Sequence, residues 1–483
     1  MRILLVAPAI MDHINGRLQV VGVDAVRECP PVGVYALATL LEEAGHVVAI
    51  ADMVQSGTNQ LLQLTSSPDA FDLIGISATS MAWPTAVDVI SQIRRLGCKV
   101  PIVCGGIHPS LFDIHILTSF PVDFVIRGEG ETPLLRLCEV ISGHGSLDSV
   151  PSLTWRNKAG ELVQNPEKQR FSKQEIGELP LPDYSRLEPG AYKCLAIESS
   201  RGCAFDCVFC STPYRKSWRA ISPEVFVDRL ETVMQHIDRV RTGCIHIVDD
   251  EFALNPRRAM AIADCMHERG LSPQLLYDAR APDVVAPGFL ERFAGLTAGM
   301  LIGAECGYDE GLLRVGKGIT CQSLKDAAAA LAKAGIADRV DFSFIMGLPW
   351  ETLAEVEKTI RFATQLHADY GVHIMLQWYR QIPGSNLWAD AERDQKVTAA
   401  MYDNYGFFGD YYLLTTACKL SAREMYKVGD HLDRVGWLAG LHGRSRPSIV
   451  HALPAALTDY FPRHLLNTQN PTSANLPLEG IRP

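Results

Sequence analysis

Hydrophobic and polar positions follow two periods along the first 145 residues. Continuous apolar runs of five or six residues predict buried strands, and apolar residues recurring every three or four positions between them predict amphipathic helices. Strands interleaved with helices favour a parallel, doubly wound, Rossmann-like sheet over residues 1–145, which binds ligands at the carboxyl ends of its strands. The predicted strands are 2–7, 47–51, 73–77, 100–104 and 122–126, and the predicted helices are 33–45, 85–96 and 132–141.

The turn after the first predicted strand lacks the glycine spacing of a dinucleotide site. Residues 7–13 read Ala-Pro-Ala-Ile-Met-Asp-His, without G-x-G-x-x-G. Glycines cluster instead after the fourth and fifth strands, at 105–106 and 128–130. They put backbone that a ligand can approach closely at one rim of the sheet, although glycine is also an ordinary turn residue.

The alternation stops between residues 146 and 190, which predict a linker with a hairpin around 157–160 and a proline-rich end at 179–184. A second strand–helix alternation then predicts an open (β/α)6 partial TIM barrel over 191–390, with its chemistry at the strand carboxyl ends. A small, mostly helical region is expected at 391–463, and a polar tail at 464–483. The predicted barrel strands are 193–199, 244–248, 274–279, 300–306, 339–346 and 373–379, and the helices include 223–237, 257–269, 323–334 and 353–367.

The charge and cysteine content of the chain limit the partners and the cellular compartment that we expect for it. The net charge of −10 and the pI near 5.8 argue against a nucleic-acid-binding face and against attachment to an anionic membrane. No apolar run approaches the ~18 residues that span a bilayer. Thirteen cysteines without a repeated framework are typical of a protein in the reducing cytoplasm.

Three of these cysteines stand close together, directly after the first predicted barrel strand. The segment 200–211 reads SRGCAFDCVFCS, with Cys203, Cys207 and Cys210 at spacings of four and three. Thiolates bind zinc and iron–sulfur clusters, but a structural zinc needs a fourth ligand, and the next histidine, His236, lies 26 residues downstream within a predicted helix. A four-iron cluster held by three cysteines would keep one iron open. Zinc and a chance grouping of core cysteines stay as alternatives.

Cys203-x-x-x-Cys207-x-x-Cys210 resembles the signature of the radical S-adenosylmethionine (SAM) enzymes, which lies on the loop after barrel strand one. The resemblance implies that the three cysteines are catalytic and hold a [4Fe–4S] cluster. It also implies that the amino and carboxylate groups of SAM chelate the open iron. One electron from the cluster then cleaves SAM and frees a 5′-deoxyadenosyl radical.

Further positions resemble the same family. The segment 249–251, Asp-Asp-Glu, ends barrel strand two, where the family often has Gly-Gly-Glu to hold the SAM amino group. Glu305 resembles the acid of strand four, 344–351 resembles the segment against adenine, 382–385 resembles a Pro-Gly-Thr turn, and Arg219 matches a common arginine beyond the cluster. Strand-end carboxylates also form purely structural ion pairs, so each match alone has that alternative. The resemblance implies SAM contacts from Phe209, Asp249, Asp250, Glu251, Arg280, Glu305, Met346, Gln377 and Tyr379.

The N-terminal domain resembles the cobalamin-binding domain of one branch of this family. This resemblance rests on three segments: Pro-Val-Gly at 31–33, Gly-Gly-Ile-His-Pro at 105–109 and Arg-Gly-Glu-Gly-Glu at 127–131. The resemblance implies cobalamin contacts from Pro31, Gly33, Ser77, Thr79, Trp83, Gly105, Gly106, His108, Arg127, Gly128, Glu129 and Gly130.

The sequence does not decide which residue would lie against the lower face of the cobalt. His13 is a candidate cobalt ligand, but Met11 stands where base-off cobalamin proteins have the aspartate that orients the histidine. Trp83 is a second candidate for this face, although an aromatic residue at a helix start is more often core. The aromatic segment 405–412 either closes over a substrate or belongs to a core.

The resemblance predicts a cobalamin-dependent radical SAM methyltransferase of class B type, which methylates an unactivated carbon of a small metabolite, for example in natural-product biosynthesis. The 5′-deoxyadenosyl radical would abstract a hydrogen atom, and methylcobalamin would supply the methyl group. An electron donor of flavodoxin or ferredoxin type is expected, with no nucleic-acid or membrane partner. The alternatives are a cyclase, ring rearrangement or dehydratase with the same cofactors, and a non-catalytic protein that binds cobalamin and an iron–sulfur cluster.

Overall fold

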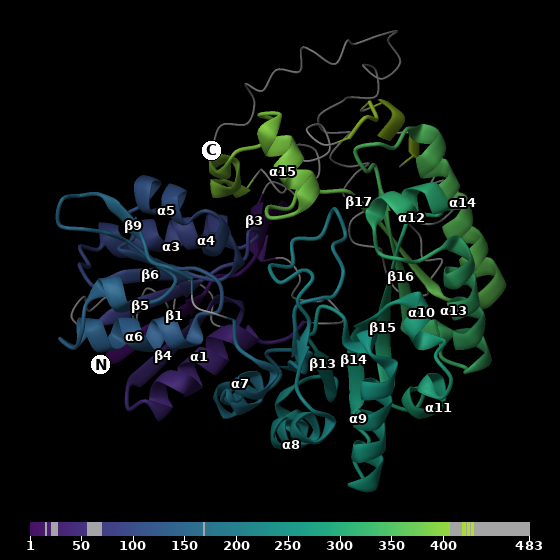
Figure 1. Cartoon of the computed structure of the whole chain (residues 1–483), viewed down its shortest axis with the longest axis horizontal. Coiled ribbons are helices and arrows are strands. Elements are labelled where there is room, and N and C mark those ends of the chain that lie inside the picture. The colour runs from purple at the N-terminus through teal and green to yellow at the C-terminus, as the bar shows by residue number, and fades with distance from the viewer. Residues whose placement is uncertain are drawn as a thin grey trace.

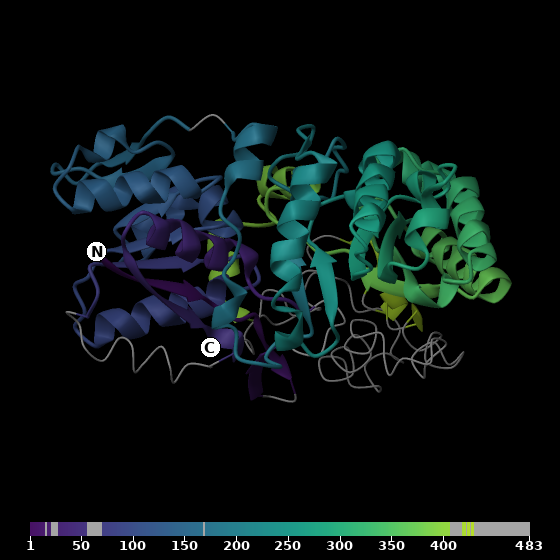
Figure 2. The same cartoon turned by 90° about the horizontal axis from the view of Figure 1, so that it is seen from below.

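The computed structural model describes residues 1–14, 17–20, 28–55, 70–167, 170–405, 418–421, 423–425 and 427–428. Two α/β units lie side by side, the N-terminal unit in purple and blue and the second in teal and green (Figures 1 and 2). Most of the predicted C-terminal region and the whole predicted tail lie outside the described residues. No helix in the described part is both long enough and apolar enough to cross a membrane.

The N-terminal sheet is parallel over its first five strands, in the order β4-β1-β5-β6-β7. The predicted doubly wound fold is confirmed. The hairpin expected in the linker is instead part of this sheet, because β8 pairs antiparallel with β7 and β9 with β8. The strands are β1 (Arg2–Ala7), β4 (Val47–Asp52), β5 (Leu73–Ser77), β6 (Ile102–Gly105), β7 (Phe124–Ile126), β8 (Leu153–Arg156) and β9 (Leu162–Gln164).

Alternate side chains of each strand face opposite layers of helices, as the period of two requires. In β1, Ile3 and Leu5 pack with residues of α1 and α6, whereas Leu4 and Val6 pack with residues of α3 and α5. Both faces of the sheet are therefore buried, which explains why its strands are apolar throughout. The helices are α1 (Val32–Glu43), α3 (Trp83–Arg95), α4 (Ile107–Leu111), α5 (Asp113–Ser119) and α6 (Glu131–Ile141).

The strand order reverses direction at β1, since β4 lies on one side of it and β5 on the other. Parallel sheets bind ligands beside such a switch point, outside the strand carboxyl ends. The loops that follow β1 and β5 flank this point, and the loops after β6 and β7 continue the same rim of the sheet. A small antiparallel hairpin, β2 (Met11–Ile14) and β3 (Arg17–Val20), follows β1.

The second unit is a six-stranded parallel sheet in sequential order, as expected for an open partial barrel. Its helix starts follow local rules: Ser222 caps helix α8, whose first residue is Pro223. The strands are β10 (Cys194–Ile197), β13 (Cys244–Ile247), β14 (Gln274–Ala279), β15 (Thr297–Glu305), β16 (Val340–Met346) and β17 (His373–Trp378). The helices include α8 (Pro223–Met234), α9 (Pro256–Glu268), α12 (Asp309–Val315), α13 (Cys321–Lys333) and α14 (Leu353–Tyr370).

The chain returns to the N-terminal unit after the barrel. Helix α15 (Asn386–Arg393) and the short helix η7 (Ala399–Asp403) lie above α3, α4 and α5 in Figure 1. Asp403 accepts a hydrogen bond from Trp83 Nε1 at 2.9 Å and pairs with His115 Nε2 at 2.9 Å. Tyr192 donates to the buried Asp52 at 2.7 Å, at a second contact between the units.

Candidate functional site

The cysteine loop joins two very short strands, β11 (Ser200–Arg201) and β12 (Arg219–Ala220). Gly202 has φ +80°, and a Cβ there would lie 2.2 Å from the Ser217 carbonyl oxygen, so only glycine fits this turn. Cys203 N donates to Tyr214 O at 3.2 Å, and Ser217 N donates to Cys203 O at 3.0 Å. The loop of residues 202–218 is therefore ordered by its own backbone.

The thiols of Cys203 and Cys207 are not activated as nucleophiles. Burial raises the pKa of Cys207 to about 12, with Glu305 among the smaller contributions, and burial also raises the pKa of Cys203, with Glu251 and Asp250 contributing. A nucleophilic cysteine needs a lowered pKa, whereas a bound metal deprotonates its thiols outright. Three thiols grouped on one ordered loop are a donor set that fits a metal centre.

The cysteine arrangement does not fit a single ion. Within the described ranges, no three His, Cys, Asp or Glu side chains converge on one point where they could hold a metal ion. A structural zinc needs four such ligands around one atom. In a cluster, by contrast, each thiolate binds a different iron atom, so the three sulfurs need not converge.

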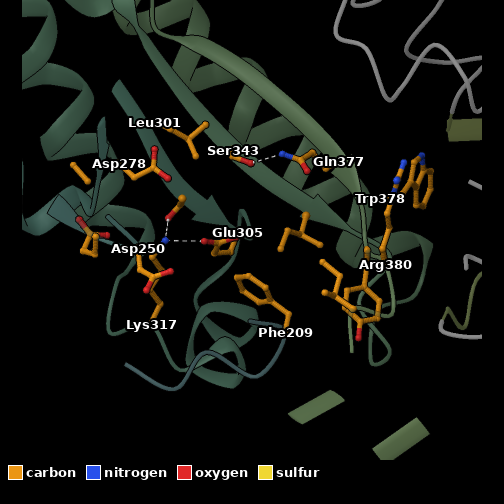
Figure 3. Close-up of a pocket in the computed structure, with 16 residues that line it drawn as sticks. Phe209, Asp250, Asp278, Leu301, Glu305, Lys317, Ser343, Gln377, Trp378 and Arg380 are labelled. Atoms are coloured by element: carbon orange, nitrogen blue, oxygen red, sulfur yellow. Dashed lines mark hydrogen bonds and ion pairs between the residues drawn. The ribbon is translucent and has the colours of Figure 1, made fainter. Parts of the chain in front are cut away.

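A cleft of about 280 Å³ opens at the carboxyl ends of the barrel strands, beside this loop (Figure 3). Inward-facing residues of β15 and β16 line it, whereas their outward neighbours pack in the core. Six of the nine predicted SAM contacts line the cleft, namely Phe209, Asp250, Glu251, Glu305, Gln377 and Tyr379. Gln377 donates to Ser343 Oγ at 2.9 Å across its wall.

Glu251 brings an unsatisfied carboxylate to this cleft. Its side chain lines the cleft, the residue is 4 % exposed, and Oε1 is buried without a hydrogen-bond partner. Burial raises the pKa of Glu251 to about 8, although Lys317 opposes the shift. A buried acceptor without a partner is costly, so this oxygen is ready for a donor from a ligand.

Glu305 and Lys317 form a largely buried ion pair in the same cleft. Lys317 Nζ lies 2.8 Å from Glu305 Oε1 and donates to Gly303 O at 3.1 Å (Figure 3). Burial alone would lower the pKa of Lys317, but Glu305 and Glu251 outweigh it and raise the pKa above its usual range. Glu305 has φ +62°, where the β15–β16 register shifts, so its backbone adopts a conformation that non-glycine residues seldom take.

Lys317 was not among the site residues predicted from the sequence. The available signal was Gly316-Lys317-Gly318 directly after a short helix, in which both glycines have positive φ. Gly316 ends α12 in the left-handed conformation, and the chain then turns so that the lysine enters the cleft.

Three predicted SAM contacts lie elsewhere. Asp249 is buried and accepts four hydrogen bonds from Ser199 and Ser200, so it fixes the start of the cysteine loop. Arg280 stacks on Phe205 at 3.9 Å and donates to the carbonyls of the 317–318 turn, which positions Lys317. Met346 is fully buried in the barrel core.

The two other segments that resembled the family have structural explanations. Glu351 accepts hydrogen bonds from Gly347 N at 2.7 Å and Leu348 N at 3.0 Å, so it closes the turn after β16. Gly384, in the turn after β17, accepts a hydrogen bond from Arg215 of the cysteine loop at 2.8 Å. This second turn therefore supports the cysteine loop.

The rim of the N-terminal sheet faces the other side of the cysteine loop. A second cavity, of about 240 Å³, is lined by Ser110 and Gly128 from the rim and by Thr212 and Tyr214 from the loop. Gly106 has φ +94°, and a Cβ there would lie 2.8 Å from a carbonyl of the neighbouring loop. The predicted contacts that lie on or near this rim, at strand ends or helix starts, are Pro31, Gly33, Ser77, Thr79, Gly105, Gly106, Gly128 and Gly130.

Trp83 and His108 lie in the core beneath the rim. Both are fully buried, and their rings stack at 4.8 Å between centroids. Phe112 and Tyr402 complete the aromatic cluster. Burial lowers the pKa of His108 to about 3. Trp83 is therefore a core residue in this structure.

Arg127 and Glu129 are engaged in ion pairs. Arg127 Nε lies 3.5 Å from Asp113 Oδ2, and Glu129 contacts Arg201 and Arg219. His13 belongs to β2, but its side chain lies outside the described part, as do residues 406–412 of the aromatic segment.

Comparison with known proteins accounts for both units. Residues 18–137 match the B12 binding domain family, and residues 197–363 match the radical SAM superfamily. An uncharacterized methyltransferase of Pyrococcus horikoshii is 30% identical over 400 residues, which cover 80% of this chain and 82% of the relative. The anaerobic magnesium-protoporphyrin IX monomethyl ester cyclase of Rubrivivax gelatinosus is 26% identical, over 90% of this chain and 76% of its own.

A solved structure has the same fold. The cobalamin-dependent S-adenosylmethionine radical enzyme OxsB, with aqua-cobalamin and S-adenosylmethionine bound, superposes with a TM-score of 0.65 at 18% identity. The match covers 96% of this chain and 71% of OxsB. The arrangement of both units is therefore shared with a protein that holds the two ligands.

Proposed function

Because this chain belongs to the radical SAM enzymes that carry a cobalamin-binding domain, we propose that it methylates an unactivated carbon of a small metabolite. Its cofactors are a [4Fe–4S] cluster, SAM and cobalamin. When bound, the cluster supplies the electron that cleaves SAM, and the cobalamin supplies the methyl group. The protein contributes binding and orientation. A cytoplasmic location and an electron donor of flavodoxin or ferredoxin type belong to the same proposal.

One observation carries this proposal: the cysteine loop lies between the barrel cleft and the rim of the N-terminal sheet. Phe209 of the loop lines the cleft, while Thr212 and Tyr214, a few residues on, line the cavity shared with the rim. Groups bound in the two units would thus lie on either side of one short loop. Such proximity is what a transfer between them requires.

Within the cleft, we assign the SAM amino group to Glu251, whose Oε1 lacks a partner. Asp278 and Gln377 offer acceptor oxygens to the ribose hydroxyls, and Phe209 offers an apolar surface. Lys317 supplies a positive charge among the carboxylates of the cleft and so reduces their repulsion of a ligand that itself carries a carboxylate.

SAM binding should release a proton from Glu251. With a pKa of about 8, Glu251 is protonated in the ligand-free protein at neutral pH, and the N–H donors of an iron-bound amino group beside it favour the ionised form that accepts them. SAM affinity should therefore rise by up to about tenfold per pH unit between pH 6 and pH 8. The same raised pKa makes the ligand-free protein lose stability as the pH rises from the unfolded value of about 4.5 through about 8.

Calorimetric titration in buffers of different ionisation enthalpy measures this proton release. Glu251→Gln should bind SAM more weakly at pH 8, and its affinity should change little with pH. An unchanged pH dependence in Glu251→Gln would assign the proton to another group.

The products of SAM distinguish methyl transfer from other reactions. Methyl transfer consumes two SAM molecules, of which one loses its methyl group and leaves S-adenosylhomocysteine, while the other yields 5′-deoxyadenosine. With the reduced enzyme and its substrate, we expect the two products in about equal amounts. 5′-Deoxyadenosine without S-adenosylhomocysteine would contradict the proposal.

That second outcome would favour a cyclisation or another rearrangement. The similarity to the Rubrivivax gelatinosus cyclase over 90% of this chain is the observation that supports this candidate. It keeps the same two units and the same cleft, and differs only in the fate of the substrate radical.

A further inference from the structure

Two arginines close the base of the cysteine loop. Arg201 in β11 and Arg219 in β12 are register partners in the short antiparallel ladder. Their side chains are 16% and 11% exposed, so two like charges lie largely buried near each other. Such a pair is stable only if carboxylates neutralise it.

The N-terminal unit supplies two of these carboxylates. Glu129 Oε1 lies 2.9 Å from Arg219 Nη1 and 3.4 Å from Arg201 Nη1. Glu131 Oε1 lies 2.7 Å from Arg201 Nη2. The side chains of Glu129 and Glu131 are only 9% and 15% exposed, so solvent screens these contacts weakly.

Other contacts make this group a network. Glu198, which follows β10 in the barrel, pairs with Arg201 at 2.8 Å. Glu129 Oε2 accepts from Phe171 N at 2.8 Å, and Arg219 Nη1 donates to Phe171 O at 2.7 Å. We call Glu129, Glu131, Glu198, Arg201 and Arg219 the interdomain clamp.

The clamp connects directly to a cysteine. The Arg219 guanidinium lies 5.0 Å from the centre of the Tyr214 ring, and Tyr214 O accepts the hydrogen bond from Cys203 N. On the other side, Arg201 is separated from Cys203 only by Gly202, whose conformation is fixed. A shift of either arginine therefore moves the backbone of Cys203.

We propose that Glu129 and Glu131 are positioning residues, which hold the cysteine loop in register with the rim of the N-terminal sheet. The clamp thereby sets the spacing between groups bound in the barrel cleft and groups bound on the rim. This inference rests on the proposed function for its chemical consequence, but its structural claim concerns this chain alone. It assigns Glu129 to the cysteine loop, in place of the cobalamin contact expected from the sequence.

Hydrogen–deuterium exchange tests the structural claim. In Glu129→Gln and Glu131→Gln, amides of the 202–218 loop should exchange about tenfold faster, because charge-assisted bonds at its base are lost. Glu139→Gln is the matched control. Glu139 lies on α6, as Glu131 does, and its ion pair with Arg136 at 2.7 Å is exposed. The control should exchange like the wild type.

Two reactions of SAM, measured without substrate, test the chemical consequence. Reductive cleavage to 5′-deoxyadenosine depends on the cysteine loop and the barrel cleft but not on the rim, so in the clamp variants it should fall far less than methyl loss. Methyl loss to S-adenosylhomocysteine with reduced cobalamin needs both units, and it should fall by about tenfold or more, because a displacement of about 1 Å costs that much or more. A merely structural role would lower both reactions together with cofactor content.

Each outcome decides the inference. Loop exchange in both variants equal to that of Glu139→Gln would overturn it, and so would equal losses in the two reactions. If Glu129→Gln does not fold, Glu131→Gln gives the same test, because Glu129 and Glu198 remain on Arg201. If the wild-type protein performs neither reaction, the proposed function fails. Hydrogen–deuterium exchange of the 202–218 loop then remains as the test of the interdomain clamp.

Discussion

Alanine in place of any one of Cys203, Cys207 and Cys210 removes the bound cluster and lowers reductive SAM cleavage by on the order of a thousandfold or more. Three thiolates are already the minimum that can hold a four-iron cluster with one open iron. Within the described residues, no group of three or more His, Cys, Asp or Glu side chains forms another site that could take up a metal. Iron content and 5′-deoxyadenosine formation, both measured anaerobically, check this expectation.

Two other cysteines provide the controls. Cys138 is buried in the N-terminal unit, and Cys265 lies on α9 of the barrel, and neither lines the cleft. Cys138→Ala and Cys265→Ala should keep iron and SAM cleavage. A triad variant that behaves like these controls would exclude the cluster from this loop.

Lys317→Met should cost about 3 kcal/mol of unfolding free energy and weaken SAM binding by more than about tenfold. The substitution keeps the length of the side chain but leaves Glu305 and Glu251 without their shared cation. The uncompensated negative charge of Glu305 then opposes any ligand that carries a carboxylate. Denaturant unfolding and equilibrium SAM binding measure the two effects separately.

Lys333→Met is the comparison for this variant, because Lys333 is exposed at the end of α13. It should change unfolding free energy by less than about 0.5 kcal/mol and should not affect SAM binding. If Lys317→Met binds SAM as tightly as Lys333→Met, Lys317 only stabilises the fold.

Local patterns were sufficient for the architecture. Apolar runs such as 2–7 coincide with strands because both sheet faces are covered, and Ser222-Pro223 marks a helix start by its own chemistry. The hairpin of β8 and β9 was also predicted, but its pairing with β7 was not. Pairing of β8 with β7 joins residues about 30 apart, and no local signal specifies such a contact.

Residues of the candidate site could be predicted only where they belong to a short sequence motif. The cysteine triad lies within one short segment, 203–210, and Glu251 lies within another, 249–251, so each was recognised from local sequence. Whether a strand-end acid faces the cleft or the backbone depends on the fold, which is why Asp249 binds two serines while Glu251 is unsatisfied. Lys317 reaches Glu305 through a turn whose course only the three-dimensional structure gives.

The rim residues illustrate the same limit. Trp83 and His108 follow strand ends, as ligand-binding residues do, but residues 388–403 pack over them. That cover comes from a segment about 300 residues later in the chain. Its position could not be inferred from the pattern around Trp83.

The electron paramagnetic resonance spectrum of the reduced protein, recorded with and without SAM, addresses the open iron in the cysteine loop directly. We predict a [4Fe–4S]⁺ signal whose g values shift when SAM is added, because SAM binds the iron that the three cysteines leave free. A spectrum without such a signal, or one that SAM leaves unchanged, would contradict the assignment of this loop as the site where SAM is bound and cleaved.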